Sequence, residues 1–196
     1  MLEELGRTAY LILPLLAAAV THGFFIKFDW LKSLKTPIDR GATLGGKPLF
    51  GANKTWRGLI VVATGATVMA AVQGYWLHRY PTVASWEYFN YGEIQPIVFG
   101  VLYGLSAMLA ELPNSFVKRR LDIQPGQAGS GFWLTVFYVV DQVDLLIGVW
   151  VVLAFYMNFD WSLMWKPLSI SFALIFFGHQ LVTVIGYFLG MRDTWR

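Results

Sequence analysis

Five long apolar runs divide the chain, separated by shorter polar stretches. Each is close to the ~20 residues that a helix needs to cross a bilayer. The runs cover Thr8–Ile26, Gly58–Leu77, Pro96–Leu112, Phe132–Met157 and Leu168–Gly190. Polar loops between apolar runs of this length are typical of a polytopic membrane protein. The pattern predicts an all-α fold with about five transmembrane helices, forming a single integral-membrane domain over residues 1–196.

The composition supports this prediction. Charged residues make up 14% of the chain and hydrophobic residues 56%, whereas soluble domains average about 25% charged residues. Mean hydropathy is +0.52. The chain contains no cysteine, which excludes disulfides, zinc-thiolate sites and a cysteine nucleophile.

Lysine and arginine residues are unevenly distributed between the loops. Twelve of the 15 fall in the segment Lys27–Arg57, after the third run and in the C-terminal tail, all of which lie on one side of a five-span protein. Cytoplasmic loops carry an excess of Lys and Arg. We therefore expect the N-terminus outside, the C-terminus inside, and a long cytoplasmic loop between the first two helices. The expected location is the cytoplasmic membrane.

Two aspartates, Asp141 and Asp144, lie inside the fourth apolar run. Residues three apart share one face of a helix, so both carboxylates point into the same space. Each costs about 2.5–3.5 kcal/mol at the centre of a membrane helix, which makes an incidental pair improbable. Three explanations remain open from these residues alone: ion pairs with Lys or Arg of another helix, an ion or proton relay, or a divalent cation site.

The first cytoplasmic loop combines glycines with basic residues in the segment "GANKTWRG", which contains Lys54, Thr55 and Arg57. Glycines let backbone amides approach phosphate closely, and Lys, Arg and Thr supply charge and a hydroxyl. The spacing of a P-loop is missed. Attraction to anionic lipid headgroups explains the charge but not the clustering, so we interpret the segment as a phosphate-binding loop.

The second cytoplasmic loop opens with "AELPNSFVKRR". Pro113 is expected to end or kink the third helix. Asn114 and Ser115 would then cap a new turn carrying Lys118 and Arg119, and a helix N-terminus beside basic side chains is an anion site.

Glu111 lies at the cytoplasmic rim of the third run, where a third metal ligand could sit. One membrane face is thus expected to gather three acids and two basic loops. Carboxylates that bind Mg²⁺ and cations that bind phosphate are typical of phosphoryl or nucleotidyl transfer.

At these residues the sequence resembles the CDP-archaeol synthase family, relatives of the CTP:phosphatidate cytidylyltransferases. The resemblance lies in four blocks in the same order: "PID.G" at 37–41, "G.NKTWRG" at 51–58, "NSFVKRR" at 114–120 and "DQVD" at 141–144. It extends to the chain length and the five-helix layout. The wider pattern S-x-x-K-R followed by D-x-x-D is met by Ser115, Lys118, Arg119, Asp141 and Asp144.

The resemblance implies a membrane cytidylyltransferase that transfers CMP from CTP to a lipid phosphate and releases pyrophosphate. It implies that Asp141 and Asp144, with Glu111, hold Mg²⁺. The phosphates would be neutralised by four cationic side chains, those of Lys54, Arg57, Lys118 and Arg119. Hydrogen bonds to nucleotide or phosphate are expected from Asn53, Thr55, Asn114 and Ser115. Asp141, Asp144, Lys118 and Arg119 are the expected catalytic group.

The sequence departs from the family pattern in ways that leave the lipid open. It has Ala110-Glu111 where archaeal members often have Gly-Asp, and it lacks a proline before the aspartate pair. An archaeol-type ether lipid phosphate, phosphatidic acid and another polyprenyl-type phosphate remain alternatives. An ion- or proton-coupled transporter using the Asp pair is the alternative function. The expected partners are CTP, the lipid phosphate and membrane lipid, with no nucleic acid; a homodimer is left open.

Overall fold

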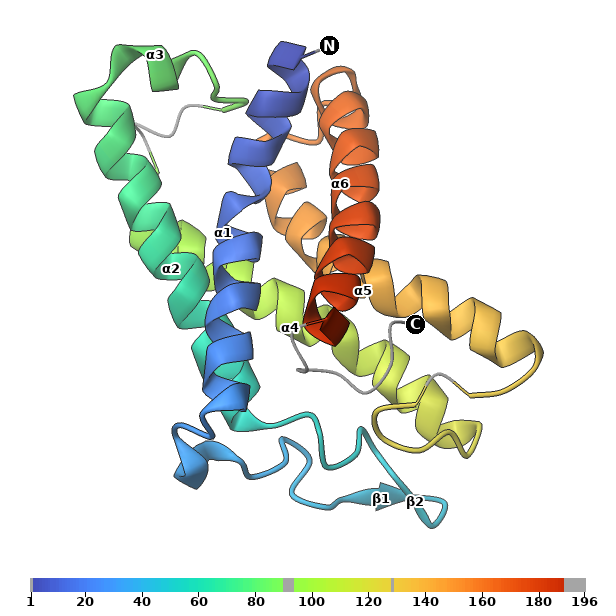
Figure 1. The fold of residues 1–196 in the computed structure, drawn as a ribbon. Coiled ribbons are helices and arrows are strands. Elements are labelled where there is room, and N and C mark those ends of the chain that lie inside the picture. The colour runs from blue at the N-terminus through green and yellow to red at the C-terminus, as the bar shows by residue number, and fades with distance from the viewer. Residues whose placement is uncertain (1, 90–93, 128, 189–196) are drawn as a thin grey trace.

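The computed structural model describes residues 2–89, 94–127 and 129–188. Figure 1 shows a bundle of long helices with connecting segments at both ends. The long helices are α1 (Leu2–Lys27), α2 (Trp56–Arg79), α4 (Pro96–Arg120), α5 (Phe132–Tyr156) and α6 (Trp161–Phe188). All five are long and apolar enough to cross a membrane. The predicted all-α, five-span fold is therefore confirmed.

The remaining elements are short. Helix α3 (Pro81–Ala84) follows α2, and the loop between α1 and α2 holds a 3-10 turn, η1 (Lys32–Leu34), and a small hairpin of β1 (Thr43–Leu44) and β2 (Lys47–Pro48). The hairpin was not predicted. Gly45 and Gly46 both have positive φ, which a two-residue hairpin turn of type I′ requires.

Several helices extend beyond the apolar runs, because helix ends follow backbone hydrogen bonding rather than hydropathy. Helix α1 begins at Leu2 rather than Thr8, and α6 begins at Trp161 rather than Leu168. Gly190, the predicted end of the last span, and the basic tail residues Arg192 and Arg196 lie outside the described residues.

Helix α4 does not end at Pro113, as the sequence had indicated, but continues through it to Arg120. The prediction that Asn114 and Ser115 cap a new turn is wrong. A proline removes a single backbone donor, and membrane helices tolerate this where neighbours hold the following turns. Lys118 and Arg119 therefore lie in the last turn of α4, where cations complement the negative end of the helix dipole, and not at an anion-binding N-terminus.

Small residues let α4 pack closely on α2. Gly100 and Gly104 form a G-x-x-x-G pair, and a Cβ at either position would overlap the backbone of α2 at Thr67 or Ala63. Such pairs allow membrane helices to approach at backbone distance. Gly148 on α5 plays the same part, since its missing Cβ would overlap the carbonyl group of Ser106 on α4.

Polar side chains compensate for a proline inside α1. Pro14 cannot donate to the carbonyl oxygen of Tyr10, four residues earlier. Gln73 of α2 supplies the missing donor, with its Nε2 2.6 Å from that oxygen. Tyr103 of α4 donates to the carbonyl oxygen of Leu11 at 3.2 Å. These buried contacts join α1 to α2 and α4. They also supply hydrogen bonds to backbone carbonyl groups, which lipid chains cannot do.

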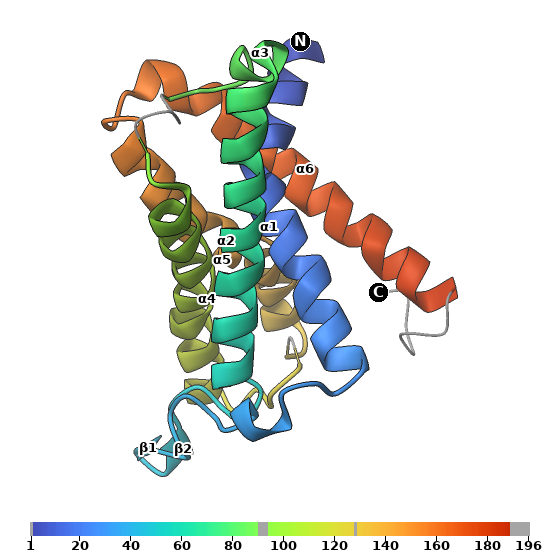
Figure 2. The same ribbon diagram turned by 90° about the vertical axis from the view of Figure 1, so that its left-hand side faces the viewer.

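The two ends of the bundle differ. The N-terminus and α3 lie at one end, and the hairpin, η1 and residues 121–127 and 129–131 lie at the other (Figure 1). Figure 2 shows α6 leaning away from the other helices toward its C-terminal end. The two basic loops thus share one end, as predicted. The assignment of that end to the cytoplasm stays a prediction from charge.

Replacing Gly148 by alanine is expected to destabilise the folded protein by about 1–3 kcal/mol, because overpacking at a tight contact forces the backbones apart. The measurement is thermal unfolding in detergent. The matched control is Gly23→Ala on α1, where a Cβ meets nothing within 4 Å. Equal unfolding temperatures for the two variants would contradict the close approach of α4 and α5.

Candidate active site

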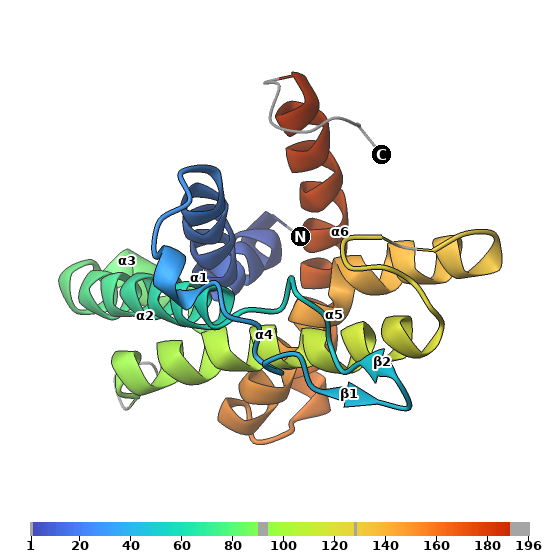
Figure 3. The ribbon, with the colours of Figure 1, turned by 90° about the horizontal axis from the view of Figure 1, so that it is seen from below.

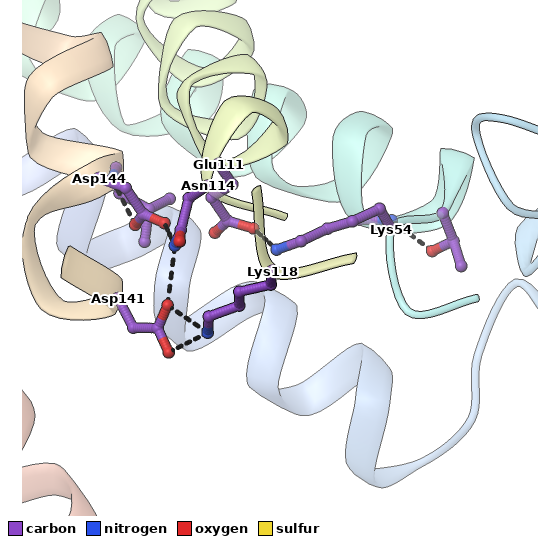
Figure 4. A network of polar contacts seen from close by, with 9 residues as sticks. Lys54, Glu111, Asn114, Lys118, Asp141 and Asp144 are labelled. Carbon is purple, nitrogen blue, oxygen red and sulfur yellow. Dashed lines mark hydrogen bonds and ion pairs between the residues drawn. The ribbon is translucent and has the colours of Figure 1, made fainter. Parts of the chain in front are cut away.

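The polar centre lies between one face of α4 and the N-terminal half of α5 (Figure 4). Asn114 projects from α4 between the two aspartates, and its Nδ2 donates to Asp141 Oδ1 at 2.7 Å and to Asp144 Oδ2 at 2.8 Å. Lys118, one turn further along α4, donates through Nζ to both carboxylate oxygens of Asp141 at 2.6 and 2.5 Å. Four predicted site residues are therefore brought together.

The two aspartates differ in how their charge is compensated. Asp141 has Lys118 as a direct counter-ion. Asp144 is buried, and its hydrogen-bond donors are neutral: Asn114 Nδ2 and, at 2.8 Å, the backbone N–H of Leu145. With both carboxylates ionised, these aspartates and Lys118 carry a net charge of −1. A buried carboxylate without a counter-ion is costly, so this group of side chains suits an additional cation.

Lys54 and Glu111 form a second ion pair beside the first (Figure 4). Lys54 comes from the loop before α2 and Glu111 from α4, and both side chains are mostly buried, at 17% and 15% exposure. Within the part of the chain that the structure describes, three or more acidic or histidine side chains nowhere gather closely enough to hold one metal ion. The ligand role expected for Glu111 stays a prediction.

Two residues of the predicted phosphate loop make structural contacts. Arg57 is buried and donates to Asp29 Oδ1 at 2.8 Å. Hydrogen bonds from Lys35 and then Arg57 lower the pKa of Asp29 to about 2. The hydroxyl of Thr55 accepts the N–H of Gly58 at 3.3 Å and caps α2. These contacts fasten the loop to the start of α2.

Arg119 is a buried cation at the same end of the bundle. Its exposure is 5%, and within the described residues its Nε and Nη1 have no hydrogen-bond partner. The side chain packs against Gly51 of the first loop, where a Cβ would lie 3.0 Å from Nη1. Buried polar groups are nearly always paired, so Arg119 is available to an anion. Of the other predicted binding residues, Ser115 is buried in α4 and Asn53 is exposed.

Asp39 organises the glycine-rich loop, a role that the sequence reasoning missed. Its carboxylate accepts the backbone N–H groups of Gly41, Phe50 and Gly51 at 2.9, 2.9 and 3.2 Å. Burial alone would raise the pKa of Asp39, but these N–H donors lower it overall. The sequence signal was the Asp-x-Gly of "PID.G", since Asp side chains often bind backbone N–H groups two residues later.

A second unpredicted contact joins the two loops. The guanidinium of Arg120, at the end of α4, donates to the carbonyl oxygens of Leu44, Lys47 and Pro48 in the hairpin. In the opposite direction, Lys47 of the hairpin forms an ion pair with Asp122 after α4, with Nζ 2.6 Å from Oδ2. Figure 3, seen from the site end, shows the hairpin lying beside the C-terminal end of α4. The loops therefore form one layer across this end of the bundle.

Comparison with known proteins adds to this geometry. The family model of CarS-like CDP-archaeol synthase matches residues 1–196. The chain belongs to the CDP-archaeol synthase family. A CDP-archaeol synthase of Archaeoglobus fulgidus is 28% identical over 196 residues, which cover 98% of both chains. That of Methanocaldococcus jannaschii is 27% identical over 171 residues, covering 82% of this chain and 83% of the relative.

A solved structure of an intramembrane enzyme for archaeal membrane lipid biosynthesis has the same fold. Its TM-score is 0.63 at 22% identity, over 90% of this chain and 92% of that one. Membership of the CDP-archaeol synthase family confirms the predicted enzyme class, a membrane CTP-dependent cytidylyltransferase in archaeal lipid synthesis. The alternative of an ion-coupled transporter receives no support from these comparisons.

Proposed function

We propose that the protein transfers CMP from CTP to the phosphate of an archaeol-type ether lipid, forming a CDP-lipid and pyrophosphate. The observation that carries the proposal is the convergence of Asp141, Asp144, Lys118 and Lys54 from three separate segments at one end of the bundle. The relatives named CDP-archaeol synthase favour an ether lipid over phosphatidic acid.

The reaction is an in-line displacement at the α-phosphorus of CTP. An oxygen of the lipid phosphate forms a bond to that phosphorus, and the bond from the phosphorus to the oxygen bridging it to the β-phosphate breaks. The electron pair of the broken bond leaves with pyrophosphate. A phosphate monoester is already an anion near neutral pH, so no side chain has to remove a proton. Positioning and charge neutralisation therefore account for the catalysis.

Asp141 and Asp144 would hold Mg²⁺, and the residues present fit it, because Asp144 is a buried carboxylate whose donors among the described residues are neutral. When bound, Mg²⁺ neutralises phosphate charge and polarises the phosphorus–oxygen bonds. The protein supplies few oxygen ligands, which suits an ion that also binds substrate phosphates.

The cationic side chains have different roles in this proposal. The ammonium groups of Lys118 and Lys54 are held by carboxylates and can share their remaining donors with incoming phosphate. Nε and Nη1 of Arg119 have no hydrogen-bond partner among the residues that the structure describes, so Arg119 is the strongest candidate for a direct phosphate contact. Arg57 is paired with Asp29 and acts by holding the loop that carries Lys54.

The site is proposed to face the cytoplasm from the cytoplasmic membrane, since both basic loops lie at its end of the bundle. CTP would approach through the loop layer, and the lipid phosphate from the headgroup region beside α4 and α5. Pairing with a second copy of the chain stays a prediction, which crosslinking in native membranes would test.

The experiment that tests the proposal is incorporation of labelled CTP by the purified protein, with Mg²⁺ and a panel of lipid phosphates. The panel contains an archaeol-type ether lipid phosphate, phosphatidic acid and a polyprenyl phosphate. We expect CDP-lipid and pyrophosphate in equal amounts, with the ether lipid phosphate the best substrate. Absence of any CDP-lipid would contradict the reaction, and a preference for phosphatidic acid would contradict the lipid assignment alone.

A further inference from the structure

The carboxamide of Asn114 is satisfied on one side only. Its Nδ2 lies within 2.8 Å of an oxygen of each aspartate, whereas its Oδ1 is buried and has no hydrogen-bond partner among the described residues. A buried amide oxygen without a donor costs about 1–3 kcal/mol. The orientation of Asn114 is therefore one that the two carboxylates impose, because an ionised carboxylate only accepts hydrogen bonds.

The two ends of a carboxamide have nearly the same shape and opposite chemistry. Rotation by a half turn about χ2 exchanges Nδ2 for Oδ1 without moving the backbone, and this torsion is broad and roughly two-fold. An amide N–H cannot coordinate a cation, but an amide oxygen is a good ligand for Mg²⁺ and Mn²⁺. A cation held between Asp141 and Asp144 would therefore favour the flipped orientation.

We propose that Asn114 is an oxygen ligand of the divalent cation held by Asp141 and Asp144, and that its carboxamide flips when the cation binds. The inference rests on the proposed function, since the cation is the one that the reaction would use. It gives the ion three protein oxygen ligands from two helices. It leaves the carboxylate of Glu111 to its partner Lys54.

This role accounts for an asparagine at position 114. Without the cation, its N–H groups hold two like charges together on α5; with the cation, its oxygen completes the ligand set. An aspartate could serve as a ligand but could not donate to the other two carboxylates. A leucine or alanine could do neither.

The test is Mn²⁺ binding to the purified full-length protein without CTP or lipid, followed by electron paramagnetic resonance, with Mg²⁺ as competitor. We expect Asn114→Ala to weaken Mn²⁺ binding about tenfold or more, the range found when partners of a metal site are removed. Asn114→Asp should bind Mn²⁺ at least as tightly as the native protein, because it keeps an oxygen ligand. The matched control is Asp160→Asn, at an exposed aspartate beyond the far end of α5, which should keep the native affinity. Glu111→Gln tests the rival ligand.

Three results would overturn the inference. Native Mn²⁺ affinity in Asn114→Ala would show that the side chain does not coordinate. Weak binding in Asn114→Asp would show that the N–H groups, which position the aspartates, are what matters. Loss in Glu111→Gln without loss in Asn114→Ala would assign the ligand role to Glu111. The variant Asp144→Asn distinguishes failure of this inference from failure of the proposed function. Native Mn²⁺ affinity in Asp144→Asn would contradict a cation site at the two aspartates, whatever the role of Asn114.

Discussion

Replacing Asp144 by asparagine is expected to lower the rate of CMP transfer by roughly a thousandfold or more, because a bound cation supplies several kcal/mol of charge stabilisation in the transition state. The variant removes one negative charge and keeps the size of the side chain. In the native protein Asn114 donates to Oδ2 of Asp144 and the backbone N–H of Leu145 donates to Oδ1. The single amide oxygen of the variant keeps one of these two contacts. The measurement is labelled CTP incorporation into the lipid phosphate at saturating Mg²⁺.

The loss should occur without unfolding. Asp144 is buried and forms no ion pair with the described residues, so removing its charge relieves a cost. The unfolding temperature in detergent should therefore stay at or above the native value. The matched control is Asp160→Asn at the opposite end of α5. Asp160 is exposed and accepts the N–H of Ser162 at the start of α6, and asparagine caps a helix equally well. Asp144→Asn with more than a tenth of the native rate would contradict the proposed site.

The fold was predictable because a bilayer imposes strong constraints. Every backbone polar group in lipid must be satisfied within the protein, so an apolar run of about 20 residues has few structures open to it. The spacing of three residues on a helix placed Asp141 and Asp144 on one face of α5. The alternation of five spans across the bilayer indicated that the acids and both basic loops meet at one end of the bundle, which the structure bears out.

The partner of each charged residue could not be predicted, since it depends on how the helices pack. The sequence treated Lys54 and Arg57 as equivalent phosphate ligands, yet Lys54 pairs with Glu111, 57 residues away, and Arg57 with Asp29, 28 residues away. Residue types do not distinguish these two pairings. The position of Asp29 is also set by a positive φ of 51°, a backbone geometry for which the residue type gives a weak signal.

The course of α4 beyond Pro113 was mispredicted for a related reason. A proline after an apolar run usually marks the end of a helix, and local preference alone favours that interpretation. Here the residues after it have tertiary partners: Asn114 and Lys118 bind the carboxylates of α5. The continuous helix places Glu111, Asn114 and Lys118 at spacings of three and four, on one face. Because the helix was predicted to end at Pro113, the sequence did not show that one face of α4 organises the site.

Removing divalent cations with EDTA is expected to stop CMP transfer completely, and added Mg²⁺ to restore it. The described residues supply too few acidic ligands to enclose an ion, and Mg²⁺ commonly completes its shell with water and substrate phosphates. The ion should therefore bind more tightly when the triphosphate is present. The measurement is the initial rate against free Mg²⁺ at several CTP concentrations, and the Mg²⁺ concentration for half-maximal rate should fall as CTP rises.

EDTA should leave the protein folded, because Lys118 and Asn114 hydrogen-bond the two aspartates from within the protein. The unfolding temperature with and without EDTA is the control that separates loss of catalysis from loss of structure. The double substitution of Asp141 and Asp144 by asparagine should be inactive at every Mg²⁺ concentration. Full activity in EDTA would contradict a cation-dependent reaction. A Mg²⁺ requirement independent of CTP would contradict an ion shared between α5 and the triphosphate, because such an ion must bind both.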